Sequence, residues 1–181
     1  YNFEKIKDNP TIYIKTPKSS KLLPSFVKEN DISILMEEPL NNLITSKDDA
    51  YRDIAILETL YATGLRLSEL LSLNICNIDK NTEMVKVMGK GGKERIVPIG
   101  KIALNSINKY LENTGRSLRT DFNDPLFTNK KGVRLPKRTL QRRVKRYLLT
   151  TMGGGSVHTL RHTFATHLID RGADMLTVKE L

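Results

Sequence analysis

Two short motifs, each built around an arginine, stand far apart in this chain: residues 62–70 (ATGLRLSEL) and residues 158–162 (HTLRH). A glycine- and lysine-rich run, residues 89–93 (GKGGK), lies between them. Two guanidiniums can clamp phosphate oxygens, an imidazole can move a proton, and a loop lysine can protonate a departing alkoxide. Brought together by a fold, these groups would form a site for phosphoryl transfer that needs no metal.

Arg66 occupies a break between two expected helices. It follows Gly64, which is expected to end one helix, and it precedes a second helix that includes Glu69. A planar guanidinium fixed at such a break suits two-pronged contact with phosphate oxygens. The alternative is a surface arginine paired with Glu69 three residues later, and the local sequence leaves both interpretations open.

His158 and Arg161 are three residues apart, so at the start of a helix they share one face. That face could offer both a proton donor and a phosphate clamp. A capping or packed histidine is the structural alternative for His158. A zinc site would use His158, His162 and His167, but Arg161 lies between the first two and no carboxylate accompanies them at ligand spacing, so no metal is predicted.

Lys90 is flanked by Gly89, Gly91 and Gly92, which allow positive φ and a close approach to another chain. A phosphate-binding P-loop is not predicted, because the second Gly-Lys pair is followed by Glu94 in place of Ser or Thr. The local alternative is a solvated lysine turn.

The three motifs, in this order, resemble the catalytic domain of the tyrosine recombinases, the phage-integrase or Xer-type family, over most of the chain. The resemblance implies that Arg66 and Arg161 contact the scissile phosphate and that Glu69 supports the site from behind. It also implies that His158 takes part in proton transfer and that His162 has a supporting role. It predicts the DNA breaking–rejoining fold of that family.

The same resemblance gives Lys90 the role of the general acid that protonates the leaving 5′ oxygen. Lys93 and Arg95 would then be contacts to the DNA backbone at most, and His167 would be structural.

The family completes its site with a further His or Trp and with a nucleophilic tyrosine. None of the six tyrosines occupies the place of that nucleophile in chain order, so we expect it beyond Leu181. Residues 1–22 are expected to be a linker or the remnant of an N-terminal core-binding domain, and 23–181 a catalytic domain that lacks its C-terminal segment. The chain as given is therefore expected to be a fragment, monomeric and inactive in cleavage.

The composition fits a basic globular protein. With 181 residues and 39% hydrophobic residues the chain is long enough for one domain with a real core. A formal net charge of +10 favours a nucleic-acid or anionic-membrane partner. No long apolar run or secretory leader is present, which disfavours membrane and secretory interpretations, and the single Cys76 cannot form an internal disulfide. A cytoplasmic location is expected.

The most basic segment is 129–146, which has nine Lys or Arg residues and no acid. Apolar residues recur within it at helical spacing, which predicts an amphipathic basic helix. Such a charge run is often a solvated face, but beside the other motifs it favours contact with the phosphates of double-stranded DNA. The predicted contacts are Lys130, Lys131, Arg138, Arg142, Arg143 and Arg146.

Apolar periodicity and the positions of Gly and Pro predict a mainly α-helical domain with one small antiparallel β-sheet, an α+β fold. Two strands flank the glycine-rich run and place Lys90 at the tip of a hairpin. A helix that starts near residue 30 is expected to stop before Pro39. Further helices are expected at 47–61, from 68, at 102–111, 138–148 and 159–171, strands at 85–87, 96–99 and 125–128, and the N-cap of a last helix at Asp174.

The hypothesis is a site-specific DNA recombinase or integrase that cuts and rejoins strands through a 3′-phosphotyrosyl intermediate, without metal or nucleotide cofactor, and that acts as a tetramer on DNA in its full-length form. Two alternatives stay open at this point. One is a type IB topoisomerase, which uses a similar fold and chemistry, and the other is a non-catalytic DNA-binding module of the same fold.

Overall fold

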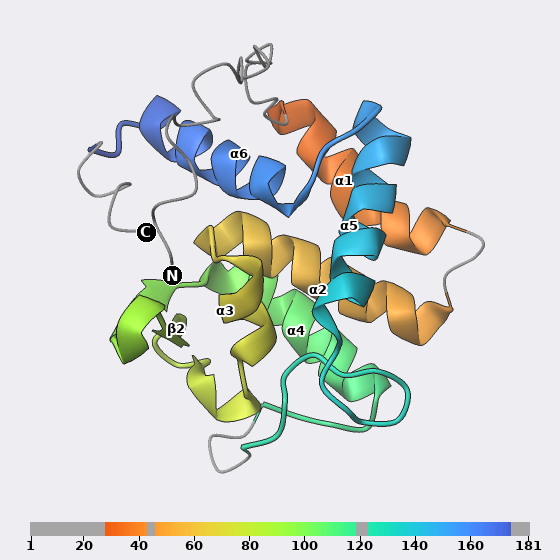
Figure 1. Cartoon of the computed structure of the whole chain (residues 1–181), viewed down its shortest axis with the longest axis vertical. Helices are drawn as coiled ribbons and strands as arrows, with labels where there is room; N and C mark the ends of the chain where they lie inside the picture. The colour runs from red at the N-terminus through yellow and green to blue at the C-terminus, as the bar shows by residue number, and fades with distance from the viewer. Residues whose placement is uncertain (1–27, 43–45, 119–122, 175–181) are drawn as a thin grey trace, which may run out of the picture.

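The structure is a computed structural model that describes residues 28–42, 46–118 and 123–174. In these residues a group of α-helices packs beside one small antiparallel sheet of strand order β1-β2-β3 (Figure 1). The predicted fold class, mainly α with a small antiparallel sheet, is confirmed. The elements are α1 (Glu29–Asn41), α2 (Lys47–Thr63), α3 (Leu67–Ser72), the 3-10 turn η2 (Ile75–Asn77), β1 (Ile78–Asp79), β2 (Met84–Met88), the 3-10 turn η3 (Lys90–Gly92), β3 (Glu94–Pro98), α4 (Gly100–Asn113), α5 (Lys137–Met152) and α6 (Val157–Asp170).

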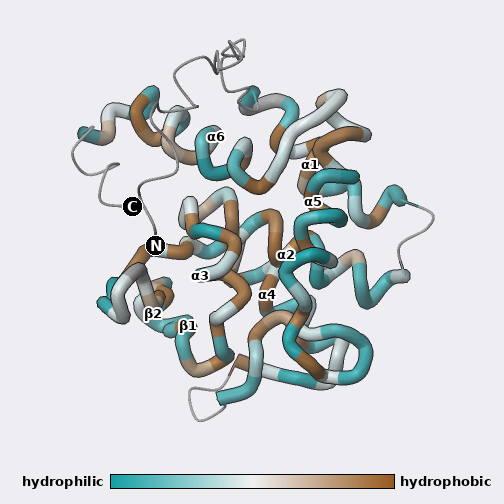
Figure 2. Tube along the Cα trace, in the orientation of Figure 1, coloured by the Kyte–Doolittle hydropathy of each residue, from teal (hydrophilic) through white to brown (hydrophobic). Residues whose placement is uncertain are grey.

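Helix α2 is the central element, and α1, α3, α4, α5 and α6 all pack against it. Its side chains are buried on most sides because of these neighbours. Ser46 caps its N-terminus by accepting a hydrogen bond from the Asp49 N–H. Figure 2 shows apolar stretches concentrated where α2, α3 and α4 meet, whereas α5 is largely hydrophilic along its length. The core therefore lies around α2, and α5 contributes to it with a narrow apolar stripe.

The predicted hairpin is confirmed as the antiparallel pair β2–β3, with Val85 opposite Val97 and Val87 opposite Arg95. The valines are buried and their sequence neighbours point outward, as expected for a sheet with one solvated face. Strand β1 was not predicted, because two residues are too few to show an alternating pattern.

Two further details differ from the sequence predictions. Pro39 lies inside α1 instead of beyond its end. Pro39 removes the hydrogen bond that an N–H at this position would make to the carbonyl four residues earlier. The helix ends two residues later, and the Asn42 N–H still bonds to the Glu38 carbonyl, so the loss is confined to its last turn. Residues 125–128 form isolated bridges, not a strand, because they pair with two separate loops, through Asn74 and Arg134. The expected helix after Asp174 lies outside the described residues.

Candidate active site

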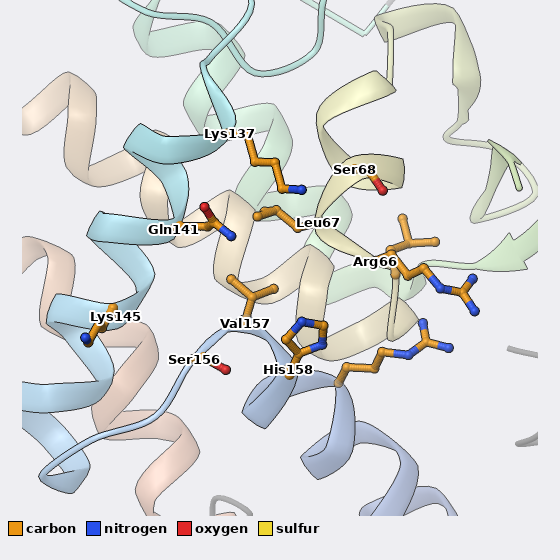
Figure 3. A pocket seen from close by; sticks show the side chains of 11 residues that line it. Arg66, Leu67, Ser68, Lys137, Gln141, Lys145, Ser156, Val157 and His158 are labelled. Atoms are coloured by element: carbon orange, nitrogen blue, oxygen red, sulfur yellow. The ribbon is translucent and has the colours of Figure 1, made fainter. Parts of the chain in front are cut away.

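One cavity of about 410 Å³ lies where the N-termini of α3 and α6 face the side of α5 (Figure 3). None of the described residues that line it is acidic, whereas five of them have cationic or titratable nitrogen groups. We call it the basic pocket. It is lined by Leu65, Arg66, Leu67, Ser68, Lys137, Gln141, Lys145, Ser156, Val157, His158 and Arg161. The two distant arginine motifs are thus brought to one concave surface.

The break before Arg66 forms as the sequence predicts. Gly64 has a left-handed backbone (φ 60°), and its N–H bonds to the Leu60 carbonyl, which ends α2. Arg66 then stands immediately before α3, and its guanidinium lies 3.0 Å from Glu69. The ion pair with Glu69 is therefore real, but the Arg66 side chain remains 55% exposed and lines the basic pocket. Pairing orients the guanidinium without removing it from solvent.

The buried carboxylate of Glu69 holds the Arg66 guanidinium in place. Its carboxylate is 6% exposed and accepts hydrogen bonds from the Arg66 backbone N–H at 2.8 Å and from the Arg66 guanidinium. It also accepts two hydrogen bonds, each 3.0 Å long, from Arg95. Burial alone would raise the pKa of Glu69, but the hydrogen bonds from Arg95 and Arg66 hold that pKa below its ordinary value. Glu69 is therefore an ionised, buried anchor.

His158 and Arg161 lie in the first turns of α6 and both face the basic pocket, as their spacing predicts. His158 is exposed to solvent. Arg161 is partly buried and donates a hydrogen bond to the Gly64 carbonyl. Burial and the charge of Arg66 lower the pKa of Arg161, which reflects how close the two guanidiniums lie. Such crowding of cations favours the binding of an anion between them.

Helix α6 is fixed to the end of α2 by two further contacts. A Cβ atom at Gly64 would lie 2.3 Å from Cδ1 of Phe164, so only glycine permits this approach. One turn further on, the Tyr61 hydroxyl lies 3.0 Å from Nδ1 of the buried His167. His167 thus has the structural role that was expected. His162 is exposed and does not line the basic pocket, so its supporting role stays a prediction.

Lys90 begins η3 at the tip of the hairpin, where Gly91 and Gly92 have positive φ values of 78° and 74°. The hairpin tip and its glycine geometry are as predicted, whereas the role of Lys90 as general acid stays a prediction. Lys93 is exposed in the same loop. Arg95 differs from the expectation, because its guanidinium is directed to Glu69 and its side chain is only 24% exposed.

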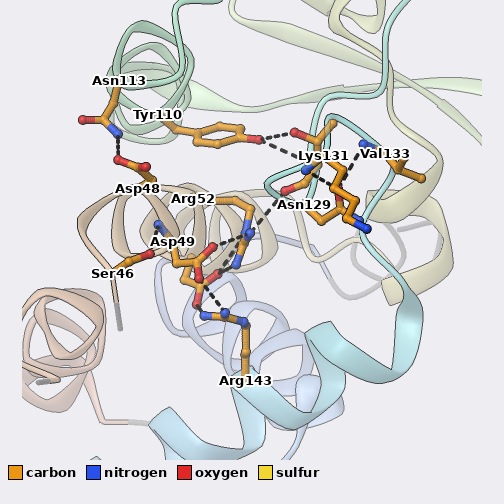
Figure 4. Close-up of polar contacts among 12 residues, drawn as sticks. Ser46, Asp48, Asp49, Arg52, Tyr110, Asn113, Asn129, Lys131, Val133 and Arg143 are labelled. Carbon is orange, nitrogen blue, oxygen red and sulfur yellow. Dashed lines mark hydrogen bonds and ion pairs between the residues drawn. The ribbon is translucent and has the colours of Figure 1, made fainter. Parts of the chain in front are cut away.

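One predicted DNA contact is disfavoured by the structure. Arg143 binds Asp53 at 2.7 Å and Asp49 at 2.9 Å across the interface between α5 and α2 (Figure 4). Arg52 binds the same two carboxylates, Asp49 at 2.7 Å and Asp53 at 3.0 Å. We call these four residues the α2–α5 ion cluster. Because its charge is compensated inside the protein, Arg143 is a poorer candidate for DNA contact than its exposed neighbours.

The other predicted DNA contacts in residues 129–146 are exposed or half-buried. Lys130, Lys131, Arg138 and Arg142 are exposed. Arg146 is half-buried, and its guanidinium lies 5.3 Å from the centre of the Tyr147 ring. Their contact with DNA stays a prediction.

Three residues that line the basic pocket were missed: Lys137, Gln141 and Lys145. Figure 3 shows them along the side of α5 that faces the pocket. Their spacing of four residues places them in one stripe of the helix, and this signal was present in the sequence. What the sequence could not give is the neighbour that this stripe faces.

Comparison with known proteins identifies the family. The model of the phage integrase family matches residues 25–181. The chain belongs to the phage integrase family. This result agrees with the resemblance drawn from the arginine and lysine motifs.

Individual relatives are tyrosine recombinases. The chain is 41% identical to tyrosine recombinase XerC of Natranaerobius thermophilus over 98% of its own length and 60% of that protein. It is 38% identical to tyrosine recombinase XerD of Staphylococcus haemolyticus over 96% of its own length and 58% of that protein. The chain therefore spans less than two thirds of these relatives.

Solved structures show the same fold. The XerH site-specific recombinase, in a pre-cleavage complex with its difH substrate, matches 90% of this chain and 48% of that chain with a TM-score of 0.73 and 27% identity. The XerA recombinase matches 86% of this chain and 54% of that chain with a TM-score of 0.72 and 28% identity.

Three features are absent from the described residues: a tyrosine at the basic pocket, a cluster of metal ligands and a membrane-spanning helix. None of the tyrosines in the described ranges lines the basic pocket. Within the same ranges no group of three or more His, Cys, Asp or Glu side chains is arranged to hold a metal ion. No helix among them is long and apolar enough to cross a membrane.

Proposed function

We propose that this chain is the catalytic part of a site-specific DNA recombinase that cuts and rejoins DNA strands through a 3′-phosphotyrosyl intermediate. The observation that supports this most is the convergence of Arg66, His158 and Arg161 on one pocket whose described lining has no carboxylate. The similarity to Xer recombinases, one of them solved in complex with its difH substrate, supports the same proposal.

In the proposed reaction a tyrosine oxygen attacks the scissile phosphorus, and the bond from phosphorus to the 5′ oxygen breaks. Arg66 and Arg161 stabilise the negative charge that builds up on the non-bridging oxygens. Lys90 gives a proton to the leaving 5′ oxygen, and His158 assists the transfer of the tyrosine proton. Attack by a 5′ hydroxyl on the phosphotyrosyl ester reverses these steps and rejoins the strand, so no nucleotide or metal is consumed.

The tyrosine nucleophile is proposed to follow Leu181 in the full-length protein. The family resemblance puts it after the His-x-x-Arg motif, and the described tyrosines do not line the pocket. The full-length protein is proposed to bind double-stranded DNA as a tetramer, with Lys130, Lys131, Arg138, Arg142 and Arg146 on backbone phosphates.

The test is covalent trapping on a DNA substrate with a nick beside the scissile phosphate, from which the cleaved product diffuses away. The full-length protein should form a covalent adduct, and Arg161→Ala should slow its formation by about 10²-fold or more, as loss of a preorganised charge donor does. Lys90→Ala should recover in part when a sulfur replaces the bridging 5′ oxygen, because a thiolate leaves without needing a proton.

The 181-residue chain is the control and should form no adduct. A phosphotyrosine on any of its six tyrosines would contradict the position proposed for the nucleophile. Absence of any adduct from the full-length protein would overturn the recombinase proposal and favour a non-catalytic DNA-binding module.

A further inference from the structure

Glu69 connects two parts of the candidate active site. Its carboxylate accepts hydrogen bonds from the backbone N–H and the guanidinium of Arg66, and from both terminal nitrogens of Arg95. Arg95 lies in β3, the strand that follows the turn beginning at Lys90. One buried carboxylate therefore links the hairpin to the arginine that lines the basic pocket.

We propose that Arg95 is a positioning residue, which holds Glu69 in the orientation that aims Arg66 into the basic pocket and which anchors the β2–β3 hairpin beside α3. The proposal rests on the recombinase function proposed above, because it assigns Arg95 to the same reaction. Arg95 is not among the residues that line the pocket, so it would act through Glu69.

The geometry of Arg95 is that of a two-pronged clamp. Its Nη1 lies 3.0 Å from Oε1 of Glu69, and its Nη2 lies 3.0 Å from Oε2. A planar guanidinium makes such a bidentate contact, whereas a lysine offers one point charge. Gly89 leaves room for this contact, since a Cβ atom there would lie 3.2 Å from Nη1 of Arg95. Replacing Arg95 by lysine would therefore keep the charge and lose the fixed orientation.

A contact with DNA is the competing role for Arg95, and its surroundings disfavour it. Its side chain is 24% exposed, compared with 55% for Arg66. Both of its prongs are directed at a carboxylate that is 6% exposed. A phosphate would have to compete with Glu69 for the same hydrogen-bond donors.

The pH at which Glu69 becomes protonated depends on its contact with Arg95, so the pH profile of cleavage can test that contact. Three guanidiniums act on its carboxylate: Arg66 from the start of α3, Arg95 from β3 and Arg161 from α6. Burial raises the pKa of Glu69, and the hydrogen bonds from Arg95 and Arg66 more than offset that effect. Without Arg95 the pKa of Glu69 would rise. A protonated Glu69 holds the Arg66 guanidinium less firmly, so the acid limb of the cleavage profile would move to higher pH.

The experiment measures covalent trapping by the full-length protein as a function of pH, with Arg95→Met, Arg95→Lys and Lys86→Met as variants. Lys86→Met is the matched control, because it removes a half-exposed cation of the same hairpin that pairs with Glu94 at 2.7 Å. We expect Arg95→Met to slow trapping by about 10- to 100-fold near neutral pH, as small misplacements of reacting groups do. DNA affinity should stay unchanged, and the acid limb should shift to higher pH.

Arg95→Lys should restore part of the rate, and Lys86→Met should behave like the parent in rate and in pH profile. If Arg95→Met traps DNA at the parent rate, or loses rate with an unchanged pH profile, the positioning role is wrong. If the variant instead loses DNA affinity in proportion to its rate, Arg95 is a DNA contact and the proposal also fails. A parent protein that traps no DNA overturns the recombinase function itself and the Arg95 proposal with it.

Discussion

Arginines have different roles in the α2–α5 ion cluster and around the basic pocket. In the ion cluster two arginines, Arg52 and Arg143, meet two aspartates, and the charges cancel. Around the pocket, the described residues Arg66, Arg95 and Arg161 all interact with one carboxylate, that of Glu69. The first region compensates its charge within the protein, whereas the described residues of the second have more cations than carboxylates, an excess that an external anion can neutralise.

The side chains of the two regions also differ in how exposed they are to solvent. Arg52 is 4% exposed and Asp53 is 2% exposed, and Asp53 also accepts a hydrogen bond of 2.6 Å from the Tyr147 hydroxyl. Arg66 is 55% exposed. An arginine in this fold is therefore structural where carboxylates match it in number and burial, and it is a candidate for binding where they do not.

The largest expected effect comes from breaking the ion cluster. Asp53→Ala should lower the free energy of unfolding by about 3–5 kcal/mol, because Arg52 and Arg143 would lose a buried partner. Urea denaturation of the 181-residue chain measures this. Arg66→Met should change the free energy of unfolding by about 1 kcal/mol or less, since its ion pair is largely exposed on the arginine side.

The difference proposed between the two regions would be wrong if Arg66→Met lowered the free energy of unfolding more than Asp53→Ala does. A large loss on Arg66→Met would mean that the pocket arginine is a structural residue. A stability change on Asp53→Ala as small as that of a surface pair would mean that the buried cluster contributes little.

A smaller effect concerns DNA affinity. If about six phosphates are engaged, the logarithm of the binding constant should fall with the logarithm of salt concentration with a slope of about −5. Replacing Arg138 and Arg142 by alanine should make this slope shallower by about 2, because both are proposed phosphate contacts and each such contact contributes about 0.9. Arg143→Met, on the same helix, should leave the slope unchanged. Fluorescence anisotropy with a labelled duplex at several salt concentrations measures all three proteins, and equal slopes would place the DNA contacts elsewhere.

The sequence was sufficient where a pattern is local. Gly64 ends α2, the glycine run makes the hairpin tip, and the three-residue spacing of His158 and Arg161 puts both on one face of α6. Each of these follows from backbone preferences within a few residues. The convergence of the two arginine motifs needed the family resemblance, because no local pattern specifies it.

The sequence was insufficient where the partner is distant. Arg143 resembles its basic neighbours, but Asp53 lies 90 residues away in the chain and neutralises it. Arg95 resembles a loop cation, but Glu69 lies 26 residues away and receives both of its prongs. Charge runs show how many cations a segment has, and only the packing shows which of them have carboxylate partners.

The central claim is that Arg66 and Arg161 stabilise negative charge on the scissile phosphate. The most direct test replaces one charged non-bridging oxygen of that phosphate by an uncharged methyl group and measures covalent trapping by the full-length parent and by Arg161→Ala. The variant should be about 10²-fold slower than the parent on the phosphate. On the methylphosphonate the rate of the variant should approach that of the parent, because the charge that Arg161 stabilises is gone. An equal deficit on both substrates would contradict the claim and would leave Arg161 as a residue that only fixes α6 to Gly64.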